Sequence, residues 1–352
     1  MTDARDRIPV HLLTGFLGSG KTTLLNRLLR EPGGSGIAVL VNELGEVGLD
    51  HDLLVRIDDA TVVLEGGCLC CTIRDDLAGA MRDLYRRRDR GEVPAFTRLV
   101  IETTGLADPA PILHTLAVEP VLCHRFRLAG VIATVDALHA GSTLARHPES
   151  VRQIAAADRL IVTKDDLCEP EALAALESRL EQLNPTAVVA RANRDDLDAG
   201  ALLADAGESV SQDGARRWLA DAAIHAGRHA HRSAGATRHG RDCTAVCLVL
   251  DEPLDWSAFG VWLTMLLHRH GTQVLRVKGL LNVSGLGAPV LVQCVQHTIQ
   301  PPVHLDAWPS GDRRSRLVVI VESLEREALL RSLGAFNGLD AGIHAAAPAT
   351  VA

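Results

Sequence analysis

The sequence lacks the features that mark membrane, secreted and nucleic-acid-binding proteins. No apolar stretch among its 352 residues approaches the roughly 18 residues of a membrane span. The first residues, Met-Thr-Asp-Ala-Arg-Asp-Arg, do not have the shape of a signal peptide. The net charge of −8 argues against a broad basic surface for nucleic acid. We therefore expect a cytoplasmic protein with no membrane and no nucleic-acid partner.

Lysine is also scarce, since only three of the 36 basic residues are lysine: Lys21, Lys164 and Lys278. Arginine does not imitate a compact ammonium at a phosphate, so a lysine kept in an arginine-rich chain marks a candidate site. Lys21 and Lys164 both fall in motifs typical of nucleotide-binding proteins. Coincidence is the alternative explanation, and it is weak beside those motifs.

Residues 15–22, Gly-Phe-Leu-Gly-Ser-Gly-Lys-Thr, fit the phosphate-loop pattern G-x-x-x-x-G-K-[ST] at every fixed position. A buried strand is predicted at residues 8–13, and apolar residues at helical spacing follow the loop. Backbone N–H groups of a glycine turn at a helix N-terminus form an anion site. We expect Lys21 to reach the β- and γ-phosphates and Thr22 to hold Mg²⁺. The alternative is a glycine-rich turn that matches by chance.

Two later segments have the positions of nucleotide-sensing loops. Residues 42–51 follow a predicted buried strand at 36–41 and are polar and glycine-punctuated, as a switch loop or a plain surface loop would be. A further strand, at 97–101, ends in Glu102-Thr-Thr-Gly105, where GTPases often carry D-x-x-G. We expect Glu102 to hold Mg²⁺ through water and the Gly105 N–H to sense the γ-phosphate.

The segment Thr163-Lys164-Asp165-Asp166 fits the pattern [NT]-K-x-D at the end of a strand predicted at 160–162. The Asp166 carboxylate can accept hydrogen bonds from N1–H and the 2-amino group of guanine, a pair that adenine does not offer. The Lys164 stem can pack along the base. The motif therefore predicts GTP rather than ATP, and it counts against a small-molecule kinase built on the same phosphate loop.

Three of the eight cysteines, Cys68, Cys70 and Cys71, lie within four positions after a strand predicted at 61–64. In a cytoplasmic chain this favours metal or redox chemistry over a disulfide framework. Thiolates suit Zn²⁺, but three of them do not close a tetrahedral site. The fourth ligand is Glu46 or an exchangeable water, and an incomplete site suits metal transfer. Small buried cysteines and a redox pair are the alternatives.

The composition changes twice along the chain. Residues 1–195 have the pattern of an α/β phosphate-loop GTPase domain with a mostly parallel sheet. Residues 196–242 are rich in Asp, Ala, Gly, Arg and His, and they indicate a solvated linker, although the imidazoles from His225 to His239 could also bind metal. Residues 243–340 indicate a smaller α+β domain with the element order β-α-β-β-β-α.

Five motifs in order, GFLGSGKTTLLNRLL, VNELGEVGLDH, GGCLCC, ETTGLADPAPIL and TKDD, closely resemble the CobW family of phosphate-loop GTPases. The resemblance implies a metallochaperone that binds GTP, Mg²⁺ and Zn²⁺ and delivers the metal to a client metalloprotein. Co²⁺ remains open, as do cobalt or iron insertion for cobalamin synthesis or nitrile hydratase, a zinc sensor or buffer, and homodimer formation.

The resemblance also assigns roles to single residues. It implies catalytic roles for Lys21, Thr22 and Glu102. It implies metal ligation by Cys68, Cys70, Cys71 and Glu46, with Thr22 at Mg²⁺. It implies nucleotide contacts at Gly15, Gly18, Ser19, Gly20, Lys21, Thr22, Thr23, Gly105, Thr163, Lys164 and Asp166. The sequence departs from the family at Thr163, which is commonly Asn, and at Val41, where some relatives carry an acid before Asn42.

Overall fold

The computed structural model describes residues 7–31, 36–42, 62–65, 73–193, 199–204, 243–338 and 343–345. Backbone contacts divide the chain into two compact units. One comprises Met1–Glu177 and Val188–Ala206, and the other Ser178–Ala187 and Gly207–Ala352. Among the described residues, no helix combines the length and the apolar character needed to cross a membrane.

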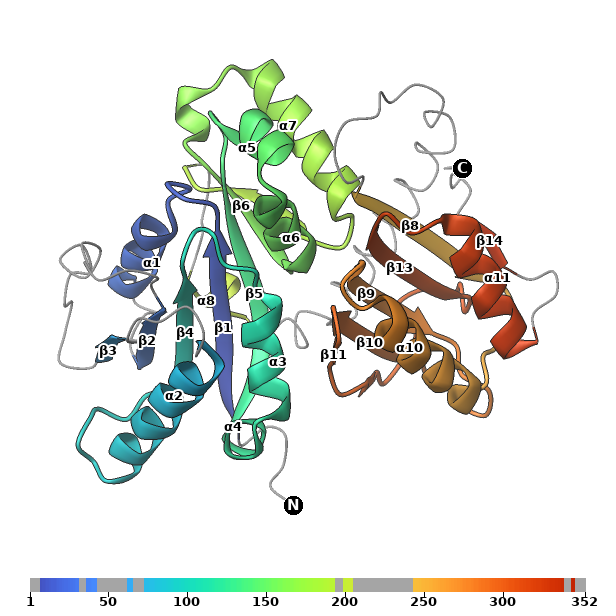
Figure 1. Ribbon diagram of the computed structural model, residues 1–352, viewed down its shortest axis with the longest axis horizontal. Helices are drawn as coiled ribbons and strands as arrows, with labels where there is room; N and C mark the ends of the chain where they lie inside the picture. The colour runs from blue at the N-terminus through green and yellow to red at the C-terminus, as the bar shows by residue number, and fades with distance from the viewer. Residues whose placement is uncertain are drawn as a thin grey trace. The chain divides into compact units, whose positions relative to one another are not determined.

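The first unit is built on a seven-stranded sheet with the order β3-β2-β4-β1-β5-β6-β7 (Figure 1). Its strands are β1 (Ile8–Gly15), β2 (Ile37–Asn42), β3 (Val62–Glu65), β4 (Arg98–Thr103), β5 (Phe126–Asp136), β6 (Arg159–Thr163) and β7 (Val188–Arg191). Every pair in this order is parallel. The predicted parallel sheet is confirmed, and the carboxyl ends of its strands therefore lie along one edge.

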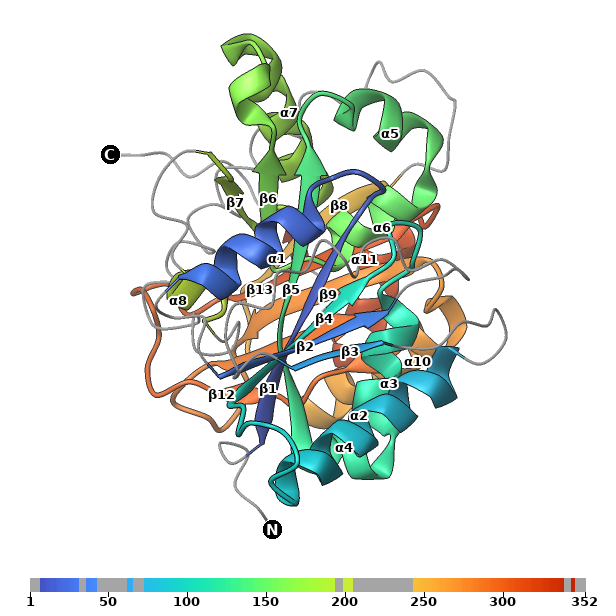
Figure 2. The same cartoon turned by 90° about the vertical axis from the view of Figure 1, so that its left-hand side faces the viewer.

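Helices cover both faces of this sheet (Figure 2). Helix α1 (Lys21–Arg30) buries Leu24, Leu25, Leu28 and Leu29 and exposes Arg27 and Arg30, as the helical period of its sequence requires. These leucines form one core cluster with strands β1, β2, β4, β5 and β6 and with Leu202 and Leu203, at and just after α8 (Ala199–Leu202). Helices α3 (Ala110–Val118), α4 (Pro120–Arg125) and α6 (Pro148–Ala156) pack against β5, with α2 (Ile73–Asp89) beside α3.

Three of these helices have no counterpart in the sequence-based prediction. Helix α4 has 6 residues, α5 (Ala140–Arg146) has 7 and α6 has 9, so none spans the 11–18 residues over which a hydrophobic period is detectable. Proline instead marks the start of two of them, since α4 and α6 both carry Pro in their first turn. Helix α7 (Pro170–Leu183) likewise begins at a proline.

The second unit contains an antiparallel sheet with the order β11-β10-β9-β13-β8-β14, with β12 paired to β10 (Figure 1). The strands are β8 (Cys243–Leu250), β9 (Val274–Leu281), β10 (Val290–Val295), β11 (Thr298–Ile299), β12 (Val303–His304), β13 (Ser315–Glu322) and β14 (Ile343–Ala345). Helices α10 (Trp256–His270) and α11 (Arg326–Asn337) share one core cluster with this sheet, around the buried Trp262. The α+β prediction is confirmed, and β14 is an additional strand at the sheet edge.

His11 lies in the middle of β1 and is fully buried. Burial, together with the guanidinium charges of Arg98 and Arg159, lowers the pKa of His11 to about 4. Arg98 also donates from Nη1 to the Leu203 carbonyl at 2.8 Å, which ties the start of β4 to the segment that follows α8. The imidazole is therefore neutral in the folded protein at physiological pH.

Because His11 is buried in its neutral form, we expect the folded protein to lose stability in mild acid. In the unfolded chain a histidine binds a proton below pH 6.5, whereas folded His11 stays neutral down to pH 4, so unfolding takes up a proton between these values. The free energy of unfolding should fall by up to about 3 kcal/mol between pH 6.5 and pH 4 from this group alone. Urea denaturation at several pH values should show a smaller pH dependence for His11→Leu than for the parent. The matched control is His124→Leu at an exposed site, and a pH-independent difference between His11→Leu and the parent would contradict the prediction.

Candidate nucleotide site

The predicted phosphate loop stands at the carboxyl edge of the parallel sheet, between the end of β1 and the start of α1. Gly15 has φ 139°, and a Cβ at this residue would lie 2.3 Å from Thr134 Oγ1 on β5. Glycine is therefore required here both by the backbone angle and by the close approach of β5. The loop closes with a hydrogen bond from the Ser19 N–H to the Phe16 carbonyl at 3.1 Å. Gly20, at φ 88°, is the N-cap of α1.

Lys21 and Thr22 begin α1 and direct their polar groups to the loop and to β4. Lys21 is buried, and its Nζ donates to the Gly15 carbonyl at 3.0 Å and to the Phe16 carbonyl at 3.3 Å. Thr22 Oγ1 donates to Glu102 Oε1 at 2.7 Å. Glu102 is buried on β4, beside Leu13 of β1. A hydroxyl and a carboxylate held together at a phosphate loop are the oxygen ligands that suit Mg²⁺.

The segment after Glu102 lies directly against the phosphate loop. A Cβ at Gly105 would lie 2.6 Å from the Leu17 backbone nitrogen, so only glycine allows this approach. Thr103 Oγ1 donates to Thr14 Oγ1 at 2.9 Å, one residue before the loop begins. The E-x-x-G segment thus lies against the phosphate loop, as the role predicted for Gly105 requires.

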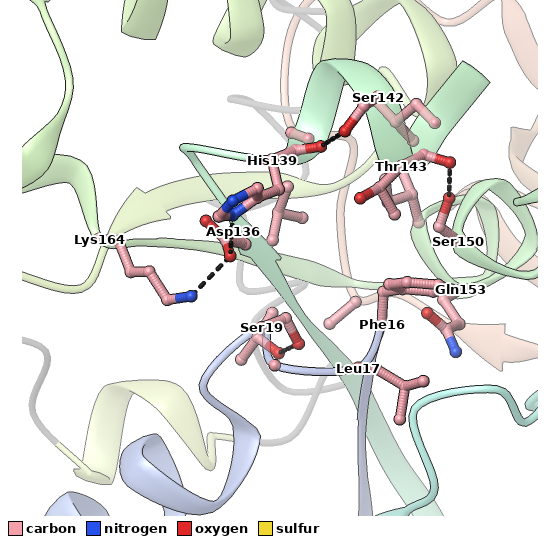
Figure 3. Close-up of a pocket in the computed structure, with 17 residues that line it drawn as sticks. Phe16, Leu17, Ser19, Asp136, His139, Ser142, Thr143, Ser150, Gln153 and Lys164 are labelled. Atoms are coloured by element: carbon pink, nitrogen blue, oxygen red, sulfur yellow. Dashed lines mark hydrogen bonds and ion pairs between the residues drawn. The ribbon is translucent and has the colours of Figure 1, made fainter. Parts of the chain in front are cut away.

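The other side of the loop is joined to β6 by Thr163. Its Oγ1 lies 2.8 Å from the Ser19 carbonyl and 3.2 Å from the Val135 carbonyl. Lys164 follows with φ 57°, and its Nζ donates to Asp136 Oδ2 at 2.6 Å (Figure 3). The T-K-D-D segment is therefore fixed to both the phosphate loop and the end of β5. Threonine at position 163 keeps a side-chain link between the two motifs.

Asn193 belongs to the site although no motif identified it. It follows β7, and its Nδ2 donates to Asp166 Oδ1 at 2.5 Å while its backbone N–H donates to Asp165 Oδ1 at 3.2 Å. The first of these bonds orients the Asp166 carboxylate, which is expected to read guanine. The second fixes Asn193 to the neighbouring Asp165. The signal was available, because a polar residue directly after a parallel strand lies at the ligand-binding edge.

Asp136 is a second residue that the sequence reasoning missed, although it ends β5 at the same edge. Burial alone would raise the pKa of Asp136, but hydrogen bonds from Lys164 and His139 outweigh it and hold that pKa below its ordinary value. The carboxylate is therefore ionised at neutral pH and fixes the Lys164 ammonium. His139 Nδ1 lies 3.0 Å from Asp136 Oδ2.

A cavity of about 370 Å³ lies beside the outer face of the phosphate loop (Figure 3). Its wall combines loop residues such as Phe16 and Ser19 with the end of β5, helices α5 and α6, and Lys164. The cavity thus connects the base-reading side of the site, at Asp136 and Lys164, with Gln153 on α6 (Figure 3).

The remaining predicted site residues divide into two groups. Gly18 and Thr23 are both exposed, Gly18 at φ 69° in the loop and Thr23 in the first turn of α1. Residues outside the described part of the chain include Cys68, Cys70, Cys71, Glu46 and the histidines from His225 to His239. Within the described part, no group of three His, Cys, Asp or Glu side chains is arranged to hold a metal.

Cys243 and Cys247 follow the histidine-rich stretch and are resolved on β8. Burial raises the pKa of Cys243 to about 12 and that of Cys247 to about 11. Both are therefore protonated thiols at neutral pH, whereas metal ligation needs the thiolate.

We expect the Thr163 hydroxyl to make a measurable contribution to the affinity for nucleotide. Thr163→Val keeps the shape of the side chain but removes both hydrogen bonds, so nucleotide affinity should fall roughly 3- to 10-fold, the effect of one net hydrogen bond. Thr163→Ser keeps the hydroxyl and is the matched control, which should bind like the parent. Titration with a fluorescent guanine nucleotide measures both. Equal affinity of the valine and serine variants would remove this role.

Comparisons with known proteins agree with this geometry. Residues 9–191 match the family described as CobW/HypB/UreG, nucleotide-binding domain, and residues 243–337 match the cobalamin synthesis protein cobW C-terminal domain. The chain is 37% identical over 344 residues to the zinc chaperone YjiA of Escherichia coli, covering 94% of this chain and 98% of that protein. It is 32% identical to the zinc chaperone CobW of Pseudomonas aeruginosa, covering 93% and 91%.

Solved structures give the same answer. The crystal structure of the Zn(II)-bound YjiA GTPase from E. coli superposes with a TM-score of 0.68 at 32% identity, covering 94% of this chain and 99% of that one. A Zn(II)-bound triple mutant of that GTPase gives a TM-score of 0.69 over the same shares. A phosphate loop, an acid at the end of β4 and a T-K-D-D segment at the end of β6, in a chain that matches both domains end to end, make this protein a member of the CobW family.

Proposed function

We propose that this protein is a GTP-hydrolysing zinc chaperone, which binds Zn²⁺ through its C-x-C-C motif and delivers it to a client metalloprotein. The observation that carries the hydrolase part is the hydrogen bond of 2.7 Å between Thr22 Oγ1 and Glu102 Oε1 at the mouth of the phosphate loop. The zinc part is supported by relatives named zinc chaperones, which this chain matches over more than nine-tenths of its length.

The described residues divide the work of binding and hydrolysis. Loop N–H groups and the Lys21 ammonium bind the β- and γ-phosphates, and Gly105 donates its N–H to the γ-phosphate. Thr22 and Glu102 are the residues that would hold Mg²⁺, which would supply positive charge beside the phosphate oxygens. No described side chain has the placement of a general base for water, so we expect slow turnover without a partner.

The base is selected by Asp166, with Asn193 holding one of its oxygens in place. Guanine offers this carboxylate two donors, and adenine offers none at the same position. Lys164 packs beside the base while Asp136 fixes its ammonium. The pair Asp166 and Lys164 therefore makes GTP the substrate.

Zinc is the cargo, and its proposed ligands are Cys68, Cys70, Cys71 and Glu46. The end of β3, three residues before Cys68 in the sequence, lies at the same sheet edge as the phosphate loop. In the strand register Glu65 of β3 pairs with Val41, and Val41 pairs with Glu102. Two strand spacings, roughly 10 Å, therefore separate the backbone that leads into the metal motif from the residue that holds Mg²⁺.

Because the two segments are close, the nucleotide state can affect the affinity of the proposed metal site. If GTP orders residues 42–51, Glu46 is brought to the thiolates, and hydrolysis withdraws it. Linkage then requires that GTP and Zn²⁺ tighten each other's binding by the same factor. A cobalt or iron insertion factor would use the same coupling with another metal, whereas a zinc sensor or buffer would bind zinc alike in every nucleotide state.

The base assignment predicts a preference for GTP over ATP of at least ~10²-fold in kcat/KM, since a site built to hydrogen-bond a group rejects analogues that lack it. Asp166→Asn should weaken GTP binding and improve binding of xanthosine triphosphate, which offers a carbonyl where guanine has its amino group. Competition titrations with the three nucleotides measure the change. Equal turnover of ATP and GTP by the parent would overturn the guanine assignment.

The chaperone proposal is tested by calorimetric titration of Zn²⁺ into the apo, GDP-bound and GTP-analogue-bound protein under anaerobic conditions. We expect zinc to bind roughly 5- to 150-fold more tightly in the GTP-analogue state, the usual range of two-site coupling. Cys70→Ser and Cys71→Ser should abolish the coupled binding, and Co²⁺ in parallel titrations tests the choice of metal.

Lys21→Ala is the control for the nucleotide half of this experiment. It should lose GTP hydrolysis while keeping the fold, because the Gly15 and Phe16 carbonyls that accept from its Nζ at 3.0 and 3.3 Å belong to the loop at the edge of the sheet. Identical zinc affinity in all three nucleotide states would leave a GTPase with a structural zinc site and would end the chaperone proposal.

A further inference from the structure

Gln153 is a fully buried polar residue on α6 that no motif covers. Its Nε2 donates to the Gly105 carbonyl at 3.1 Å and to the Ala107 carbonyl at 3.0 Å. Two carbonyl acceptors on one amide settle its orientation, because the reverse orientation would place three oxygens together. Gln153 therefore acts only as a donor towards residues 105–107.

Residues 105–107, which accept the Gln153 hydrogen bonds, include the glycine proposed to sense the γ-phosphate. On its far side Gly105 lies against the Leu17 backbone of the phosphate loop, closely enough to exclude any Cβ. Residues 105–107 are thus fixed between the phosphate loop and α6. Arg152, the neighbour of Gln153, adds an ion pair of 3.6 Å to Asp108 at the end of the same segment.

Helix α6 is itself anchored to the phosphate loop. The rings of Phe16 in the loop and His147 at the N-cap of α6 lie 4.5 Å apart. Ser150 Oγ donates to the His147 carbonyl at 2.7 Å and stiffens the first turn. The helix also packs against β1 and β5. A donor on this helix is therefore held in a fixed place relative to the bound phosphates.

We propose that Gln153 is a positioning residue for GTP hydrolysis. It holds the Gly105 carbonyl so that the Gly105 N–H is aimed at the γ-phosphate, and it does not touch the nucleotide itself. The inference rests on the proposed function and extends it to α6. Because GDP has no γ-phosphate, the contribution of Gln153 should be confined to the GTP state and the transition state. If Gln153 had only a structural role, its substitution would lower the affinities for GDP and for a GTP analogue equally.

The test uses Gln153→Met, which keeps length and volume but removes both donors, and Gln153→Glu, which places a carboxylate against two carbonyl oxygens. We expect kcat for GTP to fall ~10- to 100-fold, the effect of misplacing a catalytic group by about 1 Å. The preference for a GTP analogue over GDP should shrink, while GDP affinity stays at the parent value. The glutamate variant should be the more impaired of the two.

Gln182→Met is the matched control, because that amide donates to Ser178 one turn earlier on α7; it should behave like the parent. Thermal melts verify folding, and if Gln153→Met does not fold, Asp108→Asn decides with the same readouts, since it breaks the adjacent ion pair to Arg152. Parent-like kcat and parent-like nucleotide preference in Gln153→Met would overturn the proposal, as would equal loss of GDP and GTP-analogue affinity. Absence of GTP hydrolysis by the parent protein would instead overturn the proposed function.

Discussion

The loop from Gly15 to Gly20 stands where four strand ends converge, and the absence of two Cβ atoms makes that convergence sterically allowed. The first is at Gly15, where a Cβ would lie only 2.3 Å from Thr134 Oγ1 on β5. The other is at Gly105, where the segment after β4 meets Leu17 at 2.6 Å. With any larger residue at either position the strands would separate. The segments proposed to bind phosphate and to sense the γ-phosphate therefore both depend on close packing at these two glycines.

Short hydroxyl side chains complete what the glycines make possible. Ser19 bonds Thr134 at 2.6 Å, Thr103 bonds Thr14 at 2.9 Å, and Thr163 lies 2.8 Å from the Ser19 carbonyl. All three contacts are buried, so losing one partner would leave a polar group unsatisfied in a region of low dielectric. They join β1, β4, β5 and β6 at the loop. The residues proposed to bind the phosphates, Mg²⁺ and the base consequently share one rigid frame.

The parts of this frame that depend on local sequence patterns were predicted from the sequence. The phosphate loop, both sheets and the strand ends at Glu102 and Thr163 follow from glycine spacing and apolar runs. Gln153 does not, because its partner Gly105 lies 48 residues away and no local period indicates such a contact. Asn193 could have been noticed from its place just after a parallel strand, but its contact with Asp166, 27 residues away, could not. Asp136 is intermediate: its position at a strand end could have drawn attention to it, although the sequence analysis missed it, and its pairing with Lys164 depends on how β5 and β6 adjoin.

The strand register also limits how the metal motif can communicate with the nucleotide. Glu65, Val41, Glu102 and Leu13 form one row across β3, β2, β4 and β1. Val41 is buried in the core of that row, and being apolar it offers no ligand between the two sites. An acidic residue on β2 therefore cannot couple the nucleotide site to the metal motif in this chain. In the proposed mechanism an effect of GTP on zinc would instead run through the chain that follows β2 and β3, because the proposed ligand Glu46 comes after β2 and the three cysteines after β3.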